Sequence, residues 1–438
     1  MSGYIPNTQE DIKRMLDTMG ISSVDELFVD VPESLRMGEL NLESGKSELE
    51  VRTIIEELAL KNKQYRTVFR GAGSYDHYIP SIVKTITTKE EFVTAYTPYQ
   101  AEISQGVLQS IFEYQTMICE LTGMDVSNAS VYDGAVAAAE AVMMTQERKR
   151  TRVVVTDTVD PQVLTVVKTY CDGRSIPVCV VKSSNGRTDI EAIKEALGTD
   201  SACLLFQQPN YYGIIEDGEA LVSLAHETGA KAIMSVNPIS MGLLKTPGEC
   251  GADIAVGEGQ PLGMPMAFGG PYLGFMASTK KMMRKLPGRI VGQTEDAKGN
   301  RAFVLTLQAR EQHIRREKAS SNVCSNEALC AMTAAVFMAS VGPEGLASMA
   351  KSCFNKAHYA MSKLAEIPGV SLVYNEEFFH EFLMTCPVDP ACINKALAEN
   401  GILGGLPVDG KILWCVTEKQ SKAQIDKMVS IVQEVCCK

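Results

Sequence analysis

The hydrophobic pattern of the first 66 residues predicts short helices that form an N-terminal arm. Val51, Ile54, Ile55 and Leu58 recur three and four positions apart, so a helix over about 48–61 has one apolar side. A glutamate follows three residues after Ser23 and again after Ser47. This spacing is typical of a capping box and predicts two helix starts.

Two segments with a distinct character follow the arm. A loop rich in glycine and tyrosine, FRGAGSYDHYIP, covers residues 69–80. A long helix is predicted to begin at Thr97 and to end before Gly123, because apolar residues over 107–121 recur at helical spacing and glycine favours a helix C-terminus.

Between residues 130 and 307, β-branched runs alternate with helical segments. Strands are predicted over 153–156, 176–182, 203–207, 231–236, 254–256 and 272–277, and helices over 135–146, 162–170, 189–197 and 218–228. This alternation predicts βαβ units and a largely parallel sheet that is covered on both faces. The segments 290–294 and 302–307 predict a hairpin.

After about residue 320 the pattern predicts a small α+β unit. Helices are expected over 326–340, 344–365, 390–399 and 422–435, and strands over 370–374, 379–385 and 412–416. The fold class is therefore α/β, with a helical arm (1–66), a large doubly wound domain (67–320) and a small C-terminal domain (321–438).

Charge and composition exclude several kinds of partner. Lys and Arg number 42 against 53 Asp and Glu, which gives a net charge of −11, and no long basic run is present. Nucleic acids and anionic membranes attract clustered positive charge, so neither is expected as a partner, and a cytoplasmic protein is expected. The 13 cysteines lack the short spacings of metal sites and are interpreted as free thiols, with no metal expected.

An arm, a large doubly wound domain and a small C-terminal domain are arranged in this order in many pyridoxal-phosphate enzymes, although architecture alone does not define function. That chemistry needs a Schiff-base lysine, a carboxylate beside the ring nitrogen and a helix N-terminus for the phosphate. The strand over 231–236 leads into Asn237, and Gln260 and Pro261 lie where a lysine is expected. Lys280 and Lys281 come later and are better explained as solvated charges.

The possible phosphate site is the head of the helix that follows Asp133 and Gly134. Free N–H groups there suit an anion, but Asp133 already places a negative charge at that position, and an N-capping role explains it without a ligand. A cationic segment, 310–322, could bind a carboxylate or phosphate, or could be an interface rich in ion pairs, which is the more common use of charge runs. The cluster of Tyr96, Tyr99, Gln100 and Glu102 could cap a helix or line a polar pocket.

Five motifs in their order along the chain resemble those of the glycine cleavage system P-protein family, glycine dehydrogenase (decarboxylating), in its two-chain form and specifically subunit 1. They are FRGAGSYDHYIP (69–80), YTPYQAEISQG (96–106), GEGQPLG (257–263), GRIVG (288–292) and REQHIRREKA (310–319). The resemblance spans nearly the whole chain.

This resemblance implies a fold-type-I pyridoxal-phosphate architecture in which subunit 2 holds the cofactor and this chain binds none covalently. Together the subunits would decarboxylate glycine and pass the aminomethyl group to the lipoyl arm of the H-protein, within an α2β2 complex. This chain would then supply no catalytic residue by itself. Candidates for interface or pocket walls are Arg70, Tyr75, His77, Tyr96, Tyr99, Gln100, Glu102, Arg310, His313, Arg315 and Arg316.

The residues alone are also compatible with two other functions. A self-sufficient aminotransferase-like enzyme would use Lys280, and a scaffolding pseudoenzyme would leave all turnover to its partner.

Overall fold

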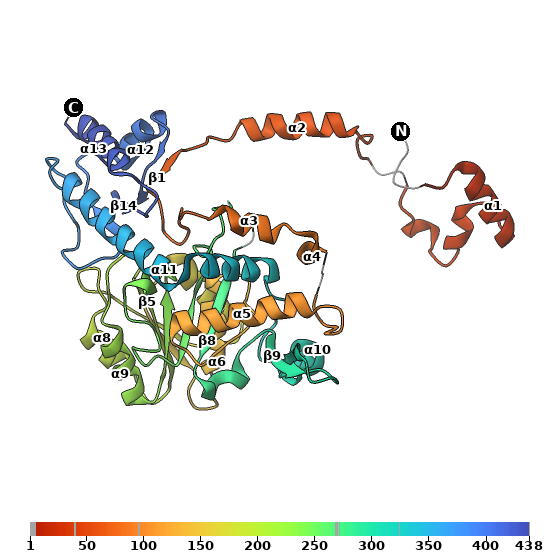
Figure 1. Cartoon of the computed structure of the whole chain (residues 1–438), viewed down its shortest axis with the longest axis horizontal. Helices are drawn as coiled ribbons and strands as arrows, with labels where there is room; N and C mark the ends of the chain where they lie inside the picture. The colour runs from red at the N-terminus through yellow and green to blue at the C-terminus, as the bar shows by residue number, and fades with distance from the viewer. Residues whose placement is uncertain are drawn as a thin grey trace. The chain divides into compact units, whose positions relative to one another are not determined.

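The computed structural model describes residues 6–38, 41–94, 97–267, 270, 272–323 and 325–437 (Figure 1). The chain divides into two units, Met1–Lys63 and Gln64–Lys438. The larger unit contains every site that is discussed below.

The N-terminal unit is a series of short helices without a core of its own. They are α1 (Gln9–Met19), the 3-10 helices η1 (Val24–Phe28) and η2 (Glu33–Leu35), and α2 (Glu48–Leu60). The capping box at Ser47 is confirmed, since Ser47 and Glu50 exchange hydrogen bonds. The one at Ser23 is wrong: Ser23 makes no side-chain cap, and Glu26 instead accepts from the backbone N–H of Ser22. No described side chain of this unit is buried.

A seven-stranded sheet forms the centre of the large unit and has the order β2-β8-β7-β6-β5-β3-β4. Its strands are β2 (Val126–Ser127), β3 (Arg152–Thr156), β4 (Val178–Val181), β5 (Ser201–Gln208), β6 (Lys231–Val236), β7 (Ile254–Glu258) and β8 (Gly274–Ser278). The five strands from β7 to β4 pair in parallel, and β8 is antiparallel to both of its neighbours. The predicted largely parallel sheet is confirmed.

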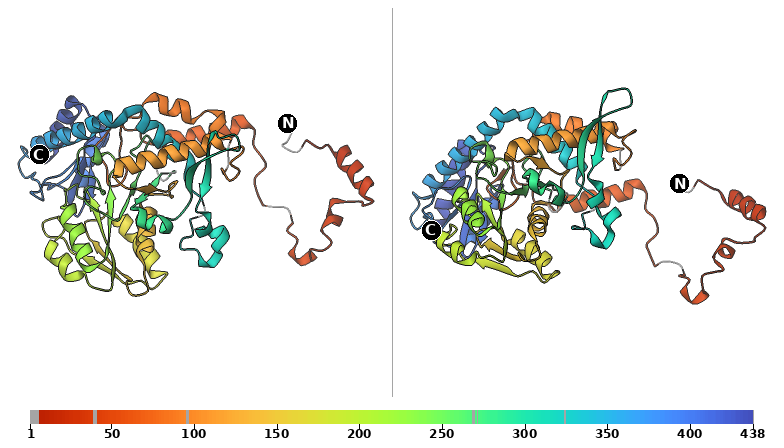
Figure 2. Two further views of the ribbon diagram at one scale, coloured as in Figure 1. Left: turned by 60° about the horizontal axis from the view of Figure 1, so that its bottom comes forward. Right: turned by 90° about the horizontal axis from the view of Figure 1, so that it is seen from below.

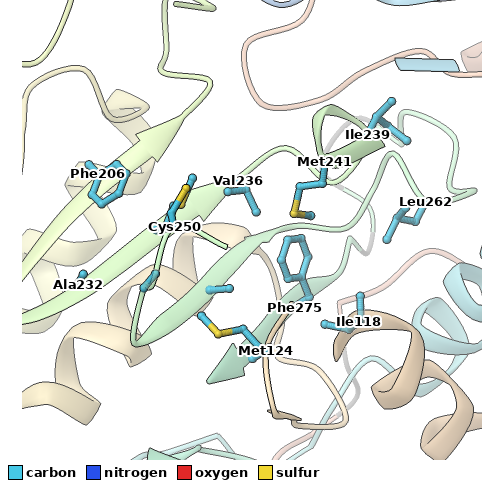
Figure 3. Close-up of a cluster of buried hydrophobic side chains, with 14 of the residues drawn as sticks. Ile118, Met124, Phe206, Ala232, Val236, Ile239, Met241, Cys250, Leu262 and Phe275 are labelled. Atoms are coloured by element: carbon cyan, nitrogen blue, oxygen red, sulfur yellow. The ribbon is translucent and has the colours of Figure 1, made fainter. Parts of the chain in front are cut away.

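Alternate residues of a strand point to opposite sides of the sheet, and here both sides carry buried apolar residues. Helices therefore cover both faces of this sheet. Val153 and Val155 belong to the core beneath α6 (Gly134–Thr145) and α7 (Pro161–Asp172). Val154 belongs to the opposite core, beneath a second set of helices, α5 (Gln105–Thr122), α8 (Ile190–Ala196), α9 (Gly218–Thr228) and α11 (Ala328–Leu364). Figure 3 shows part of that second core, where Phe275, Met241 and Val236 lie close together.

The helix predicted from Thr97 begins only at Gln105. Residues 98–103 form turns, and the backbone N–H of Tyr99 donates to the carbonyl of Thr97 at 2.9 Å. Pro98 disfavours helical geometry in Thr97, the residue before it, so a helix that includes Thr97 is unfavourable. Two shorter helices that the sequence analysis did not predict, α3 (Ser81–Thr87) and α4 (Glu90–Val93), precede this segment.

The C-terminal part packs its own sheet and helices around Trp414, which is 2% exposed. Strands β11 (Glu381–Met384), β14 (Lys411–Cys415) and β13 (Leu406–Val408) form an antiparallel sheet beside α12 (Pro390–Glu399) and α13 (Lys422–Cys436). The strand predicted over 370–374 is wrong: only Leu372 makes an isolated bridge, to Met384. The short parallel pair β1 (Thr67–Val68) and β12 (Ile402–Leu403) joins the start of the large unit to this part.

The two helices predicted over 326–365 are the halves of α11, which Gly342 interrupts with φ 62° and ψ 178°. This helix is long and apolar enough to cross a membrane by length and composition, but it packs against α5, α3 and α13 inside the unit (Figure 1).

The predicted hairpin is confirmed as β9 (Ile290–Glu295) and β10 (Arg301–Thr306), which extends away from the large sheet in Figure 2. The remaining short helices are η3 (Ser240–Gly242), η4 (Lys280–Lys285), η5 (Gln308–Arg310), α10 (Gln312–Arg315) and η6 (Arg316–Lys318).

Candidate functional site

The main candidate site is a cavity of about 370 Å³ at the carboxyl edge of the parallel strands, where open α/β sheets bind ligands. The ends of β5, β6 and β7 contribute Gln207, Ser235, Asn237 and Glu258. The head of α6 contributes Asp133 and Gly134, and the loop after β1 contributes residues 72–75.

The Glu258 side chain occupies the head of α6. Its Oε2 accepts a hydrogen bond from the backbone N–H of Gly134 at 2.9 Å. Its Oε1 accepts from the backbone N–H groups of Gln260, at 2.9 Å, and Leu273, at 3.1 Å. Burial raises the pKa of this carboxyl to about 7. A side chain of this protein therefore uses the N–H of Gly134 at the helix head, which would otherwise face a bound anion.

Gly134 is required for this arrangement. An added Cβ would lie 2.8 Å from the backbone nitrogen of Glu258, so the helix can approach β7 this closely only at a glycine. Asp133 caps the same helix by accepting from the N–H of Val136 at 2.7 Å. The two residues predicted for a phosphate site thus lie in the cavity, where the N–H of Gly134 is already bound by Glu258 and the Asp133 carboxylate caps the helix.

Asn237 occupies the position expected for the carboxylate beside the ring nitrogen, and Gln260 lies in the region expected to hold the Schiff-base lysine. Asn237 Oδ1 accepts from the N–H of Ile239 at 2.9 Å. Gln260 is fully buried, accepts from the N–H of Tyr75 at 2.9 Å and donates to the carbonyls of Tyr75 and Met264. Its amide is therefore a structural clamp on the loop after β1.

The cavity does not fit a phosphate-bearing aldehyde cofactor. Its described lining contains three carboxylates, those of Asp133, Asp160 and Glu258, and includes no lysine or arginine. Lys280 is exposed and follows the antiparallel strand β8, so it lies at the opposite edge of the sheet from the cavity. A dianionic phosphate would meet repulsion here, and a Schiff base would find no amine among the described lining residues.

The loop after β1 is tied to the C-terminal part by polar contacts. Arg70 donates to the carbonyls of Gly404 and Gly405 at 3.0 Å each. Tyr75 donates through its hydroxyl to Glu381 Oε2 at 2.8 Å, and Glu381 Oε1 accepts from the N–H of Ala72 at 2.7 Å. Burial raises the pKa of Glu381 to about 7. Tyr75 lines the cavity, whereas Arg70 is committed to this internal connection.

His77 belongs to a second buried cluster below this loop. Its Nδ1 lies 2.7 Å from Glu418 Oε2, and Cys353 Sγ lies 3.3 Å from the same oxygen. Burial opposes the charge of Glu418, but hydrogen bonds from His77 and from the N–H of Tyr78 outweigh it and lower its pKa to about 2. The ring of His380 stacks near that of His77, and burial lowers the pKa of His380 to about 3.

Of the predicted polar cluster Tyr96, Tyr99, Gln100 and Glu102, Tyr99 contacts a buried arginine. Arg289, which is 3% exposed, donates to the Tyr99 hydroxyl at 2.6 Å, and its guanidinium carbon lies 4.7 Å from the centre of the Tyr99 ring. His313 approaches the same ring edge-on at 6.3 Å between centroids. Gln100 and Glu102 are exposed, and Tyr96 lies outside the described residues.

The segment 310–318 is mostly exposed, and its arginines differ in their surroundings. Arg310 donates to the backbone carbonyls of Leu286 and Gly288, so it holds the segment to the large unit. Arg315 is exposed and donates to the carbonyl of Ala309, and Arg316 is exposed with φ 53°. The structure thus brings His313 to Tyr99 and leaves Arg70, Tyr75 and His77 in a separate region.

Sequence reasoning missed the acidic partners of these residues. Glu258 lies within the motif GEGQPLG, but only the fold shows that its side chain reaches the helix head. Glu381 and Glu418 are more than 300 residues away from Tyr75 and His77 in sequence, so no local spacing signals those pairs.

Comparisons with known proteins place these observations in context. The family profile described as glycine cleavage system P-protein matches residues 2–432. A probable glycine dehydrogenase (decarboxylating) subunit 1 of Moorella thermoacetica is 50% identical over 441 residues and covers 99% of each chain. The corresponding protein of Desulfitobacterium hafniense is 47% identical, again with 99% of each chain covered.

Solved structures agree with the sequence comparison. A crystal structure of glycine decarboxylase (P-protein) of the glycine cleavage system, in inhibitor-bound form, is 40% identical and has a TM-score of 0.93. It covers 99% of this chain and 100% of its own. A sphingosine-1-phosphate lyase of Burkholderia pseudomallei, at 15% identity and a TM-score of 0.67 over 92% of this chain and 94% of its own, shares the fold, which is that of fold-type-I pyridoxal-phosphate enzymes.

Proposed function

The chain belongs to the glycine cleavage system P-protein family, and we propose that it is the subunit of glycine dehydrogenase (decarboxylating) that does not carry pyridoxal phosphate. Subunit 2 would hold the cofactor, which supplies the electron sink for loss of carbon dioxide from glycine. The lipoyl arm of the H-protein would accept the aminomethyl group. The proposed assembly is an α2β2 complex in the cytoplasm.

One observation carries this proposal: the Glu258 carboxylate binds at the head of α6, where a phosphate would be needed. Asn237 and Gln260 also support the absence of a cofactor from this chain, because both side chains already have hydrogen-bond partners within the protein. A cavity whose helix head is occupied by a side chain of the same protein can keep the shape of the fold while the chemistry proceeds on another chain.

The contribution of this chain to turnover is then to complete the cleft of its partner. Fold-type-I sites are built at subunit interfaces, and the exposed candidates Tyr99, Gln100, Glu102, His313 and Arg316 are available for such contacts. Arg289 holds Tyr99 in place from below. Arg70, Tyr75 and His77 would support the walls of the cleft from within. We also propose the division into arm (1–66), large domain (67–320) and small domain (321–438) as the functional one.

Mixing the two purified subunits and following glycine-dependent exchange of carbon dioxide tests the proposal. Neither subunit alone is expected to be active, and the mixture is expected to turn over. Alanine replacement of Tyr99 should lower exchange without dissociating the complex, and replacement of exposed Lys281 should not change it.

Three results would overturn parts of this proposal. Pyridoxal phosphate fixed to Lys280 by borohydride in the isolated chain would support a self-sufficient enzyme. Full turnover by subunit 2 alone would support a scaffolding role. Unchanged exchange in the Tyr99→Ala complex would remove that residue from the cleft.

A further inference from the structure

A second cavity, of about 280 Å³, lies away from the carboxyl edge of the sheet. It is formed between the C-terminal half of α6, the short helix η4 and the segment 310–321. Met143 and Met144 supply an apolar wall. The charged residues around it are five cations and one acid, namely Arg284, Lys285, Arg310, Arg315, Lys318 and Glu140.

The positive charge of this cavity is largely uncompensated within the described chain. Among the residues that the structure describes, Lys285 alone of the five cations has a carboxylate within ion-pair distance, that of Glu147 at 3.6 Å. The terminal nitrogens of Arg310 donate hydrogen bonds to two backbone carbonyls, which do not neutralise its charge. Clustered like charges repel one another. The chain as a whole is acidic, with a net charge of −11, so an uncompensated positive cluster is unusual in it. A bound anion would remove this repulsion.

Unsatisfied hydrogen-bonding atoms face the same cavity. Of the nine buried side-chain atoms without a partner in the described part of the chain, three belong to its lining: Glu140 Oε1, Gln146 Oε1 and Arg310 Nε. The Glu140 side chain is 1% exposed, so it cannot reach bulk water. Buried polar groups are normally paired, so three orphans around one space indicate that water or a polar ligand occupies it. Two of these atoms need a donor and one needs an acceptor.

We propose that this cavity is a binding site for a small phosphate- or carboxylate-bearing anion that also carries a hydrogen-bond donor. The anionic group contacts Arg284, Arg315 and Lys318, and the donor contacts Glu140 and Gln146. Inorganic phosphate meets both requirements, because it carries negative oxygens and an O–H group at neutral pH. The proposal does not rest on the proposed function, although the cavity shares the segment 310–318 with residues that we propose to meet subunit 2.

Calorimetric titration of the full chain with inorganic phosphate and, separately, with malonate tests the proposal. Phosphate should bind saturably with one site per chain and more tightly than malonate, which lacks the donor at neutral pH; the opposite order would assign the site to dicarboxylates. Phosphate should also raise the unfolding midpoint by about 2 °C or more when present far above its Kd. The same ionic strength of sodium chloride should not.

Variants separate a specific site from general charge screening. Replacing exposed Arg284 and Lys318 together by alanine should weaken phosphate binding about tenfold. Glu140→Gln should strengthen it, because the amide keeps an oxygen that accepts from the phosphate O–H but no longer repels the negative charge of the phosphate. Lys281→Ala is the matched control: this lysine lies on η4 but does not line the cavity, and its removal should change affinity less than twofold.

Four outcomes would overturn the proposal. The first is that neither anion binds saturably, and the second is that Lys281→Ala loses as much phosphate affinity as the double variant. The third is that sodium chloride raises the unfolding midpoint as much as phosphate does. The fourth is that phosphate binding is lost when subunit 2 is added, which would assign the cations to the subunit interface. The increase expected for Glu140→Gln keeps the test decisive if the double variant folds poorly.

Discussion

Replacing Glu418 by glutamine should destabilise the protein in a way that depends on pH. Glu418 accepts hydrogen bonds from His77 and from the N–H of Tyr78, and its pKa is lowered from the usual 4.5 to about 2. At 1.36 kcal/mol per pKa unit, this corresponds to about 3 kcal/mol of stability. Because the folded pKa is depressed, that stability is fully present above pH 4.5 and is lost as the pH falls toward 2.

Urea unfolding of the wild type and Glu418→Gln at pH 7.5 and 3.5 measures this effect. The variant should be less stable by roughly 3 kcal/mol at pH 7.5, and the difference should shrink by about 1 kcal/mol at pH 3.5. Asp76→Asn is the control: the pair of Asp76 with Lys419 is partly exposed, so its loss should cost less than about 1 kcal/mol. Equal destabilisation of Glu418→Gln at both pH values would refute the reasoning.

Three further expectations concern the described contacts. Glu258→Ala removes the acceptor of three backbone N–H groups and should lower the free energy of unfolding by about 3 kcal/mol in chemical denaturation, and a loss below about 0.5 kcal/mol would contradict this. Gly213→Ala places a Cβ 2.0 Å from the carbonyl oxygen of Glu381 at a φ of 83°, so it should reduce soluble yield and lower the thermal midpoint by several degrees. Tyr75→Phe deprives buried Glu381 of a donor and should cost about 1–3 kcal/mol, whereas loss of less than 0.5 kcal/mol would show that water takes over this role.

Much of the fold follows from local patterns. The alternation of β-branched runs with helices between residues 130 and 307 predicts the parallel strands, because strands buried on both faces are continuously apolar. The break in α11 follows from Gly342 and Pro343, which disrupt helical geometry locally. The false strand over 370–374 has the right composition but pairs only at Leu372, and pairing depends on distant residues.

The candidate site is predictable in part. Asn237 and Gln260 can be recognised as unsuited to cofactor chemistry because their side chains lack the needed groups. The pairing of Glu258 with Gly134 requires the register of β7 against α6, and the pairing of His77 with Glu418 requires the packing of two segments that are 341 residues apart. Such contacts depend on tertiary structure and leave no trace in residue spacing.

The carboxylate at the head of α6 has a consequence for engineering and for evolution. Introducing a lysine at Pro261 alone would not restore a cofactor site, because Glu258 would still compete with an incoming phosphate and Asn237 would still be unable to hold a ring proton by charge. Several substitutions would be needed, and each one made alone would lower the stability of the fold without any catalytic gain. The division of labour that we propose between the two chains would thereby be protected against simple reversal.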